Sequence, residues 1–450
     1  MPRFFLKSSM LFLVSLALIG CDSSDFKYQN DDGIKTLTAI KPAYPNTRFV
    51  VISDPHYHNP SLGTKGSAFQ EYLDKDRKLL AESSEILSEA VKQISAIEAD
   101  FVIVCGDMTK DGERVNHQAV ASQLKKVVAA GKKVFVVPGN HDVANGESFR
   151  YQGDEVLAVA NVSAVEFKNI YHPYGFKNAL MNDSASLSYV AEPVPGLWLL
   201  ALDSCLWREN KEHDEPETEG KFSIETLGWM EDVLIASKKQ NKAVMVVMHH
   251  GIWEHYKGNE KYYAKYLVDD FEKVARMLAA YGVALVFTGH FHAQDITLAR
   301  FDNPDSFLLD IETGSLVTYP CPYRVITVSG GHTARVESRF IESTPSIPDF
   351  RQHAQNFCLE KSVLLVNAAL KKYRMSQADI DRVNTKVAEA LMTHLAGDET
   401  KPASPATAEG MGLWGKFIFS MRKDLIDAWH SDLLPADNQI TIDLKTGKTL

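Results

Sequence analysis

Short, continuously apolar runs alternate with longer amphipathic segments along the middle of the chain. The runs are, in order, RFVVIS, FVIVC, KVFVV, LWLLAL, AVMVVM and ALVF. Because their hydrophobicity is continuous rather than alternating, they predict strands that are covered on both faces. Between several of them, apolar residues recur at helical spacing, over residues 79–97, 116–130, 224–238 and 269–281. The pattern predicts an α/β domain, because strands and helices alternate along it.

The pattern changes twice toward the carboxyl terminus. From residue 296 to about 341, the segments ITLARF, SFLLDI, YRVITV and TARVESRFI follow one another without a helix, which predicts antiparallel additions or a second packed sheet. The stretch STPSIPDF then indicates a linker. Beyond it, residues 376–395, with Ser376 as a candidate N-cap, and residues 413–434 have helical patterns. We therefore expect a main domain over residues 47–342 and a small, mainly helical region over residues 343–450.

The amino-terminal residues differ from the rest of the chain. Two basic residues precede the apolar run MLFLVSLALIG, which is short for a bilayer span, so residues 1–20 indicate a secretion signal. The ending LIGC resembles a bacterial lipobox. That resemblance implies lipidation of Cys21 and anchoring at the periplasmic side of the bacterial cell envelope, with Asp22 favouring the inner membrane. The alternative is a plain signal peptide that ends near Cys21. The polar residues 21–46 are expected to form a tether.

The charge balance narrows the range of partners. The chain has 48 Lys and Arg against 58 Asp and Glu, a formal net charge of −10, and therefore no basic surplus to attract polyanions. Nucleic-acid binding is not expected. Beyond the signal, no other stretch is apolar for long enough to cross a membrane.

Four cysteines remain if Cys21 carries lipid. In an oxidising envelope they allow up to two disulfides in three alternative pairings. Cys105 lies inside the apolar run FVIVC, where a free buried thiol is favoured. The others are Cys205, Cys321 and Cys358. None of the four has zinc-finger spacing, so a cysteine metal site is not expected.

Five of the apolar runs end in side chains that can bind metal ions. Asp54 and His56 follow the first run, Asp107 the second, Asn140, His141 and Asp142 the third, His249 and His250 the fifth, and His290 and His292 the sixth. In open α/β sheets, sites form in the crevice beyond the carboxyl ends of the strands. We therefore expect these side chains to converge.

The donor set indicates the kind of metal. Aspartate, asparagine and histidine without cysteine suit divalent ions such as Mn²⁺, Fe, Zn²⁺ or Co²⁺. The candidate ligands are too many for one ion that also keeps positions open for water and substrate, so two ions that share a carboxylate fit better. Such a pair acidifies a bridging water near neutral pH and clamps the oxygens of a phosphoryl centre. Residues two apart, as in Asp54-Pro-His56 and His290-Phe-His292, point to the same side of an extended chain.

The motifs DPH, GD, GNHD, an apolar run that ends in histidine, and GHFH occur in that order. As a complete set they resemble the calcineurin-like metallophosphoesterases, over roughly residues 48–341. The resemblance implies the fold of that family, a two-sheet β-sandwich flanked by helices, with the catalytic domain over residues 47–342. Any single piece, such as GD, would carry little information.

The resemblance also implies a role for each residue. Asp54, His56 and His292 would bind the first ion, Asp107 would bridge, and Asn140, His249 and His290 would bind the second. His141 would stabilise the transition state or protonate the leaving oxygen, and Asp142 would fix its orientation.

One departure from the family pattern concerns neighbouring histidines. Family members often carry His-X-Pro after this strand, whereas this chain reads MHHGIW, with Gly251 in place of the proline. Alignment on the strand end makes His249 the ligand, and His250 remains the alternative ligand or a substrate contact.

Other residues near these motifs are candidates for the rim of the site. Residues 207–220, WRENKEHDEPETEG, are expected to form either a solvated loop or a rim of the crevice. Five side chains adjoin the metal-binding segments and are candidates for substrate contacts: Tyr57, His58, Trp253, His255 and Tyr256.

The expected function is hydrolysis of phosphate esters by a metal-bridging hydroxide, outside the cytoplasm. The resemblance to the cyclic-nucleotide phosphodiesterase-like branch favours phosphodiesters, and the anchored position allows nucleotides, phospholipid headgroups or envelope polymers as substrates. The alternatives are a phosphomonoesterase or nucleotidase, and an envelope lipoprotein whose helical region binds a partner while the site is idle. Because all metal positions hold competent residues, an idle site is disfavoured. Amide hydrolysis is disfavoured too, because the sequence has no HExxH motif.

Overall fold

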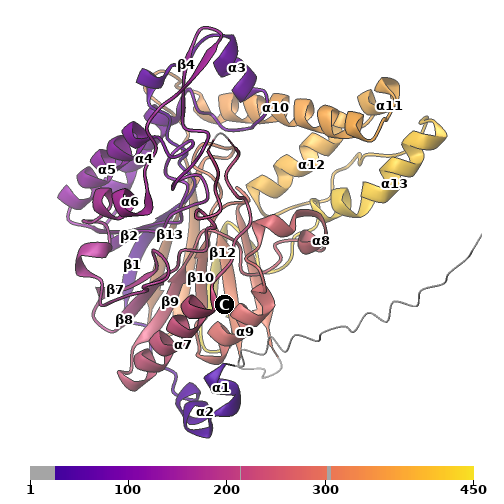
Figure 1. The fold of residues 1–450 in the computed structure, drawn as a ribbon. Coiled ribbons are helices and arrows are strands. Elements are labelled where there is room, and N and C mark those ends of the chain that lie inside the picture. Colours follow the sequence, from indigo (N-terminus) through magenta and orange to yellow (C-terminus); the bar gives the residue numbers. More distant parts are fainter. Residues whose placement is uncertain (1–25, 213, 302–305) are drawn as a thin grey trace, which may run out of the picture.

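Two seven-stranded mixed sheets pack face to face and form the main domain (Figure 1). The computed structural model describes residues 26–212, 214–301 and 306–450, so that the predicted signal and Cys21 lie outside the described residues. The predicted fold class, a two-sheet sandwich flanked by helices with a helical region at the carboxyl terminus, is confirmed.

The first sheet has the strand order β16-β15-β14-β13-β1-β2-β3. Its parallel half consists of β1 (Thr47–Ile52), β2 (Phe101–Val104) and β3 (Lys133–Val136). Its antiparallel half consists of β13 (Pro322–Ser329), β14 (Thr333–Phe340), β15 (Gln439–Asp443) and β16 (Lys448–Thr449). The carboxyl ends of β1, β2 and β3 therefore lie along one edge.

The second sheet has the order β11-β12-β10-β9-β8-β7-β6. Its parallel strands are β8 (Leu197–Ala201), β9 (Ala243–Val247), β10 (Leu285–Thr288) and β12 (Phe307–Glu312). Antiparallel strands flank them: β6 (Met181–Asn182), β7 (Tyr189–Val194) and β11 (Asp295–Arg300). The sequence left open whether residues 296–341 extend one sheet or form another, and they divide between both sheets.

Helices cover the outer faces of the sandwich, because the buried strands are apolar on both sides. α4 (Ser83–Ala96) and α5 (Arg114–Ala129) pack on the first sheet, and α7 (Ile224–Lys239) and α9 (Phe271–Ala280) pack on the second. On β8, Leu197 and Leu199 face the core between the sheets, whereas Trp198 and Leu200 face the helices. The four helical segments predicted in this domain are confirmed.

Shorter elements lie outside the two sheets. They are the helices α3 (Ser67–Leu73), α6 (Ala164–Ile170) and α8 (Asn259–Tyr263), the 3₁₀ turns Pro60–Leu62, Phe176–Asn178 and Ala264–Tyr266, and the hairpin of β4 (Phe149–Gln152) and β5 (Glu155–Ala158). α3 and the hairpin lie at the end of the domain where β1, β2 and β3 finish (Figure 1).

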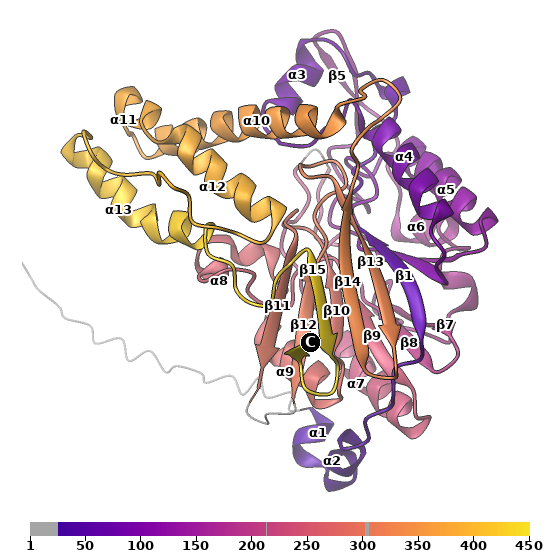
Figure 2. The ribbon, with the colours of Figure 1, turned by 180° about the vertical axis from the view of Figure 1, so that it is seen from behind.

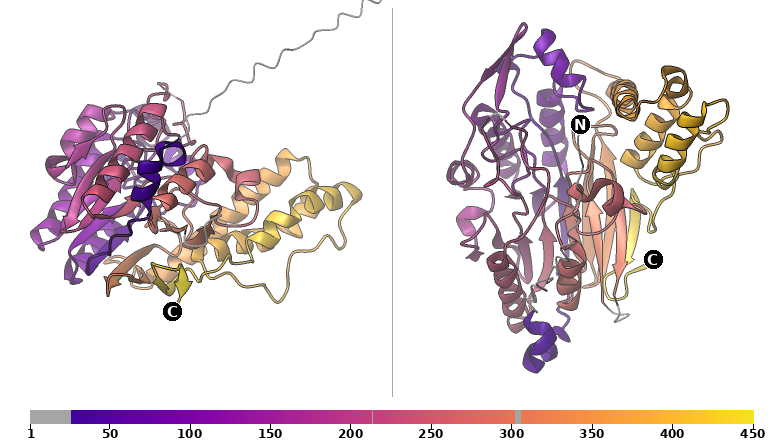
Figure 3. Two further views of the ribbon diagram at one scale, coloured as in Figure 1. Left: turned by 90° about the horizontal axis from the view of Figure 1, so that it is seen from below. Right: turned by 45° about the vertical axis from the view of Figure 1, so that its right-hand side comes forward.

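The carboxyl-terminal helices project from one side of the sandwich, as two further views show (Figure 3). They are α10 (Phe350–Lys372), α11 (Gln377–Asp381), α12 (Asn384–Ala396) and α13 (Leu413–Ala428). Ser376 caps α11 by accepting a hydrogen bond from the Asp379 N–H at 3.2 Å, but the helix predicted over residues 376–395 is divided between α11 and α12. These helices share a core with Tyr256 and Phe291 of the main domain.

Three features of the helical region differ from the prediction. The sequence did not predict α10, whose buried positions include Lys361 and Ser362 and therefore show no clean apolar stripe. α13 ends at Ala428, before the predicted limit of 434. The chain then returns to the first sheet as β15, beside β14 (Figure 2), so residues 343–450 also complete the main domain.

The segment predicted as a tether is folded on the domain from Phe26 onward. Phe26 is buried, and α1 (Lys27–Asn30) and α2 (Asp32–Thr38) lie beside α7. The backbone N–H groups of Lys27 and Tyr28 donate to the Glu231 carboxylate at 2.8 and 2.9 Å. These contacts explain why a polar stretch is ordered here.

The four cysteines outside the signal are free and buried, as predicted for Cys105. None pairs with another cysteine in the part of the chain that the structure describes. Within the same part, no helix combines the length and the apolar composition that a membrane span requires.

Candidate metal centre

The predicted ligands lie on loops that leave the carboxyl ends of β1, β2, β3, β9 and β10. Five of them have a left-handed backbone: φ is 50° at Asp54, 36° at His56, 47° at Asp107, 76° at His290 and 71° at His292. L-residues other than glycine rarely adopt this region, and it persists where the surroundings impose it, often at functional sites. The abrupt turns point side chains from both sheets into one buried volume.

Glycines let these loops approach one another closely. A Cβ atom at Gly139 would lie 2.1 Å from Asp107 Oδ1, and a Cβ atom at Gly289 would lie 2.5 Å from Asp54 Oδ2. Each glycine directly precedes a predicted ligand and packs against a ligand from another strand. The glycines of the GNHD and GHFH motifs therefore allow the loops to come close enough for the ligands to converge.

One group of ligands consists of Asp54, His56 and His292. The Nε2 atoms of His56 and His292 lie 3.1 Å apart, and Asp54 Oδ1 lies 3.3 Å from His292 Nε2. Asp54 Oδ1 is buried and has no hydrogen-bond partner among the described residues. Two facing imidazole nitrogens beside a carboxylate oxygen that accepts no hydrogen bond form a cradle that fits a cation.

A second group consists of Asp107, His249 and His290. His249 Nε2 lies 3.4 Å from Asp107 Oδ2 and 3.1 Å from Asn140 Oδ1. The Nδ1 atom of His249 contacts the carbonyl oxygen of Cys105 at 2.8 Å, which orients Nε2 toward the centre. Asp107 Oδ2 also lies 3.5 Å from His56 Nε2, so this carboxylate lies between the two groups. The structure thus brings all seven predicted ligands together.

The electrostatics of the cluster also fit metal binding. Burial lowers the pKa of His56 and of His290 well below the usual range, which favours the neutral imidazole that binds metals. Burial lowers the pKa of His249 as well, but Asp107, Asp54 and the Cys105 carbonyl together outweigh burial and raise that pKa to about 9. The donor set, oxygen and imidazole nitrogen, matches the metals expected from the sequence.

His250 lies outside this cluster. Its Nδ1 atom is 2.8 Å from Ser204 Oγ and its Nε2 atom is 3.0 Å from the carbonyl oxygen of Thr218, so both ring nitrogens are engaged. The side chain is fully buried. Of the two neighbouring histidines, the structure therefore places His249 at the centre.

His141 faces the cluster from the loop after β3. Its backbone N–H donates to Asp107 Oδ1 at 2.9 Å, and its Nδ1 atom lies 2.7 Å from Asp111 Oδ1. The side chain is 20% exposed, whereas those of Asp54, His56, Asp107 and His249 are almost fully buried. His141 is thus the polar group of the GNHD motif that can reach a bound molecule.

The role predicted for Asp142 is corrected by its contacts. Its carboxylate accepts the backbone N–H groups of Met108, Thr109 and Gly139 at 3.0 to 3.1 Å, and the Thr109 hydroxyl at 3.0 Å. It therefore holds the loops after β2 and β3 together, and Asp111 orients His141. The sequence reasoning missed Asp111, whose only local signal is an acid four residues after the Asp107 ligand.

A cavity of about 650 Å³ opens at the metal centre. Asp107, Asn140, His141, His290 and His292 line one end of it. Glu215, Pro216 and Thr218 also line it, so the loop of residues 207–220 forms part of its rim. The five predicted substrate contacts, Tyr57, His58, Trp253, His255 and Tyr256, do not line this cavity.

Two basic residues that the sequence analysis did not single out also line the cavity. Arg77 and Lys78 lie between α3 and α4, and Lys78 Nζ forms an ion pair with Asp76 Oδ2 at 3.0 Å. Burial lowers the pKa of Lys78, but Asp76, Asp107 and Asp111 outweigh burial and raise it above its ordinary value. The ammonium group therefore stays charged. Lys78 has no motif of its own, and only the fold brings it to the site.

A family model and several solved structures are similar to this chain. Residues 47–294 match the family described as calcineurin-like phosphoesterase. Similar solved structures include a dimetal phosphatase from Danio rerio, at 18% identity and a TM-score of 0.45, over 67% of this chain and 97% of that one. A purple acid phosphatase from yellow lupin (Lupinus luteus) seeds has 12% identity and a TM-score of 0.41, over 67% of this chain and 52% of its own. No curated protein matches the chain.

Proposed function

The chain belongs to the calcineurin-like phosphoesterase family, and from this premise we propose that it hydrolyses phosphate esters, preferably phosphodiesters, at a pair of metal ions. The observation that carries the proposal is the convergence of seven oxygen and nitrogen ligands beside a cavity. Such a pair of ions would supply an acidified water and positive charge toward the phosphoryl oxygens. Mn, Fe, Zn and Co all suit these donors.

The contacts suggest how the ligands would be shared. Asp54, His56 and His292 would hold one ion, and Asn140, His249 and His290 the other. Asp107 would touch both, because its Oδ2 atom lies 3.5 Å from His56 Nε2 and 3.4 Å from His249 Nε2.

His141 has the position of a proton donor. Hydrolysis joins a water oxygen to phosphorus and breaks the bond from phosphorus to the alcohol oxygen, which must gain a proton as it leaves. Because Asp111 engages Nδ1 of His141, Nε2 is the atom that can deliver this proton or hydrogen-bond to the phosphoryl group. Asp111 acts through His141 as a positioning residue.

The basic side chains at the rim suit the charge of the substrate. Lys78 and Arg77 line the cavity in which the metal ligands lie. Arg77 Nε is buried and has no hydrogen-bond partner among the described residues. A guanidinium with an unused donor is well suited to a phosphate oxygen.

The proposed location is the periplasmic side of the cell envelope, with a lipid on Cys21 and Asp22 favouring the inner membrane. The support is the sequence LIGC after a short apolar run. Mass spectrometry of the amino-terminal peptide after expression in a bacterium would detect the lipid on Cys21.

The test of the activity compares an aryl phosphodiester with the matching aryl phosphomonoester on the purified full chain. We expect turnover with Mn²⁺, Fe²⁺ or Zn²⁺, faster for the diester, and none after chelation. His141→Ala should keep the metal and lose most of the turnover, while His172→Ala, which changes an exposed histidine, should behave as wild type. Faster hydrolysis of the monoester would identify a phosphomonoesterase. No turnover under any of the three metals would favour the idle-site hypothesis.

A further inference from the structure

We propose that the preferred substrate is an amphiphilic phosphate ester taken from a membrane surface, with its phosphate at the metal centre and its hydrocarbon group among the carboxyl-terminal helices. The inference rests on the proposed phosphoesterase function. It adds the chemical class of the alcohol, which the metal ligands alone do not specify.

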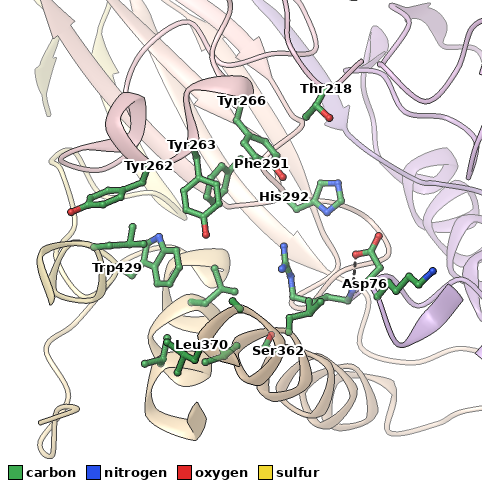
Figure 4. A pocket seen from close by; sticks show the side chains of 18 of the residues that line it. Asp76, Thr218, Tyr262, Tyr263, Tyr266, Phe291, His292, Ser362, Leu370 and Trp429 are labelled. Carbon is green, nitrogen blue, oxygen red and sulfur yellow. Dashed lines mark hydrogen bonds between the residues drawn. The ribbon is translucent and has the colours of Figure 1, made fainter. Parts of the chain in front are cut away.

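The cavity that begins at the metal centre continues between the main domain and the helical region. His292 and Asp76 lie at one end, and Tyr263, Trp429 and Leu370 line the space away from them (Figure 4). Its volume of about 650 Å³ lies within the range of sites for small molecules. A phosphate group alone would occupy only the end beside the metal ligands.

Most side chains that line the distal part are aliphatic or aromatic, and they come from several elements. Leu365 of α10, Leu391 of α12 and Phe419 of α13 line one side. Tyr266 and Phe291, on loops of the second sheet, line the other. Aliphatic and aromatic side chains on both sides suit a hydrocarbon group.

A cavity of this size is unusual for a structural interface. Protein interiors are close-packed, and voids larger than a water molecule are few. Away from this space, the same helices form a packed core, in which Ile380, Leu395 and Cys358 are fully buried. The helices thus pack well where they meet each other and leave space where they face the metal centre. That arrangement is expected of a binding site.

The polar end of the cavity matches an anionic headgroup. Arg77 and Lys78 lie beside the metal ligands, and Arg77 Nε has no partner. Charge at one end and hydrocarbon at the other is the polarity of a lipid phosphate.

The outer face of α13 indicates where such a substrate comes from. Leu413, Phe417 and Met421 follow one another at helical spacing and are 91%, 53% and 51% exposed, and Trp414 beside them is 52% exposed. The inner face of the same helix, with Ile418 and Leu425, lines the cavity. Large apolar and aromatic side chains on one exposed helix face are typical of helices that lie in a bilayer interface. We therefore assign the membrane surface as the partner of this face.

The first test is a series of p-nitrophenyl alkyl phosphodiesters from methyl to dodecyl, used below their micelle concentrations with the metal-loaded full chain. We expect kcat/KM to rise about threefold to fourfold per added methylene until the chain fills the cavity, from the free energy of burying a methylene. If the methyl ester is hydrolysed and chain length has no effect, the inference is wrong and the proposed function stands. If every ester is inert, both fail.

Matched variants test where the hydrocarbon group of the substrate binds. Leu365→Trp and Ala369→Trp add bulk to the cavity wall and should lower kcat/KM for the dodecyl ester far more than for the methyl ester. Leu364→Trp adds the same bulk at a neighbouring position that is 43% exposed, and should leave the series unchanged. Ala369 is already exposed, so Trp at this position should not prevent folding. Equal losses for both esters in both wall variants would contradict a hydrocarbon site.

The second test concerns the membrane source. The substrate is phosphatidylglycerol in phosphatidylcholine vesicles, compared with the soluble octyl ester. Phe417→Glu should lower the vesicle rate at least about tenfold and keep the rate on the octyl ester. Val165→Glu changes an equally apolar residue that is 71% exposed on α6, and should affect neither rate. A vesicle rate unchanged by Phe417→Glu would overturn the membrane assignment and leave a soluble amphiphile as the substrate.

Discussion

The Nδ1 atom of His141 lies 2.7 Å from Oδ1 of Asp111, a carboxylate that follows a different strand. Asp111 is in turn paired with Lys110, and it accepts a hydrogen bond from the Tyr72 hydroxyl at 2.9 Å. The contact decides which nitrogen of His141 faces the cavity. It also links the imidazole to a buried polar cluster that no motif of the sequence includes.

Asp111→Asn should lower kcat about tenfold to a hundredfold, the usual effect of removing the partner that orients an active-site side chain. The metal content should stay unchanged, because Asp111 contacts His141 and none of the seven metal ligands. Steady-state kinetics with elemental analysis would check this. Wild-type turnover in Asp111→Asn would show that the contact does not position His141.

Asp142→Ala should lower the free energy of unfolding. The Asp142 carboxylate accepts three backbone N–H groups and the Thr109 hydroxyl, all buried. Removal leaves these donors unsatisfied, at a cost of about 1–3 kcal/mol per buried group, which urea unfolding would measure. A loss of turnover without a loss of stability would instead support the orienting role that the sequence predicted for Asp142.

The neighbouring histidines should respond differently to substitution. His249→Ala removes a ligand 3.4 Å from Asp107 and should lower both the bound metal and the turnover. His250→Ala should keep the metal and reduce the free energy of unfolding by about 1–3 kcal/mol, because the Ser204 hydroxyl loses its buried imidazole partner and the Thr218 carbonyl keeps only His290. Measuring the bound metal in the two purified variants would show which histidine is the ligand. Loss of metal in His250→Ala alone would reverse the assignment.

Chelation should lower the unfolding temperature as well as the activity. The site gathers buried carboxylates and imidazoles, with Asp54 Oδ1 accepting no hydrogen bond from the described residues, and a cation that binds only the folded chain stabilises it. With metal at about one hundred times its dissociation constant, the gain is about 2.7 kcal/mol. Differential scanning calorimetry with and without chelator would measure it. The same unfolding temperature in both would argue against a metal that binds at the folded site.

The Asp437 carboxylate accepts the N–H groups of Ile296 on β11, at 2.8 Å, and of Asp398 after α12, at 2.6 Å. This contact between β11 and the helical region should weaken as the pH rises. Burial raises the pKa of Glu399 to about 7 and that of Asp437 to about 8. Both carboxyls then bind their protons more tightly in the folded chain than in the unfolded chain, where the pKa of each is about 4. Their stabilising effect is complete below about pH 4 and is lost as the pH rises to about 8.

Glu399→Gln removes one of these carboxyls and should flatten the fall in unfolding temperature between about pH 5 and about pH 8. Glu155→Gln, at an exposed position on β5, is the control and should follow the wild-type profile. The expectation is wrong if the Glu399→Gln and wild-type profiles are parallel.

The sequence determined the chemistry of the site because ligand type and strand end are local properties. A strand that is apolar on both faces has to be buried in a sheet, and the polar residues after it have to lie at the edge of that sheet. The strand ends therefore gave the candidate side chains, and the family resemblance selected seven of them as ligands: Asp54, His56, Asp107, Asn140, His249, His290 and His292. Within each sheet their approach was predictable because parallel strands end together, whereas the packing of the two sheets brings the ligands after β1, β2 and β3 to those after β9 and β10.

Only the tertiary structure decided what depends on contacts between loops of distant strands. The carboxylate that reaches His141 comes from residue 111 rather than from the adjacent residue 142, because the turn after β3 buries Asp142 against backbone N–H groups. The apolar cavity likewise forms only where α10, α12 and α13 meet the loops of the second sheet. Such distances are set by the packing of whole elements, and the spacing of residues along the chain does not contain them.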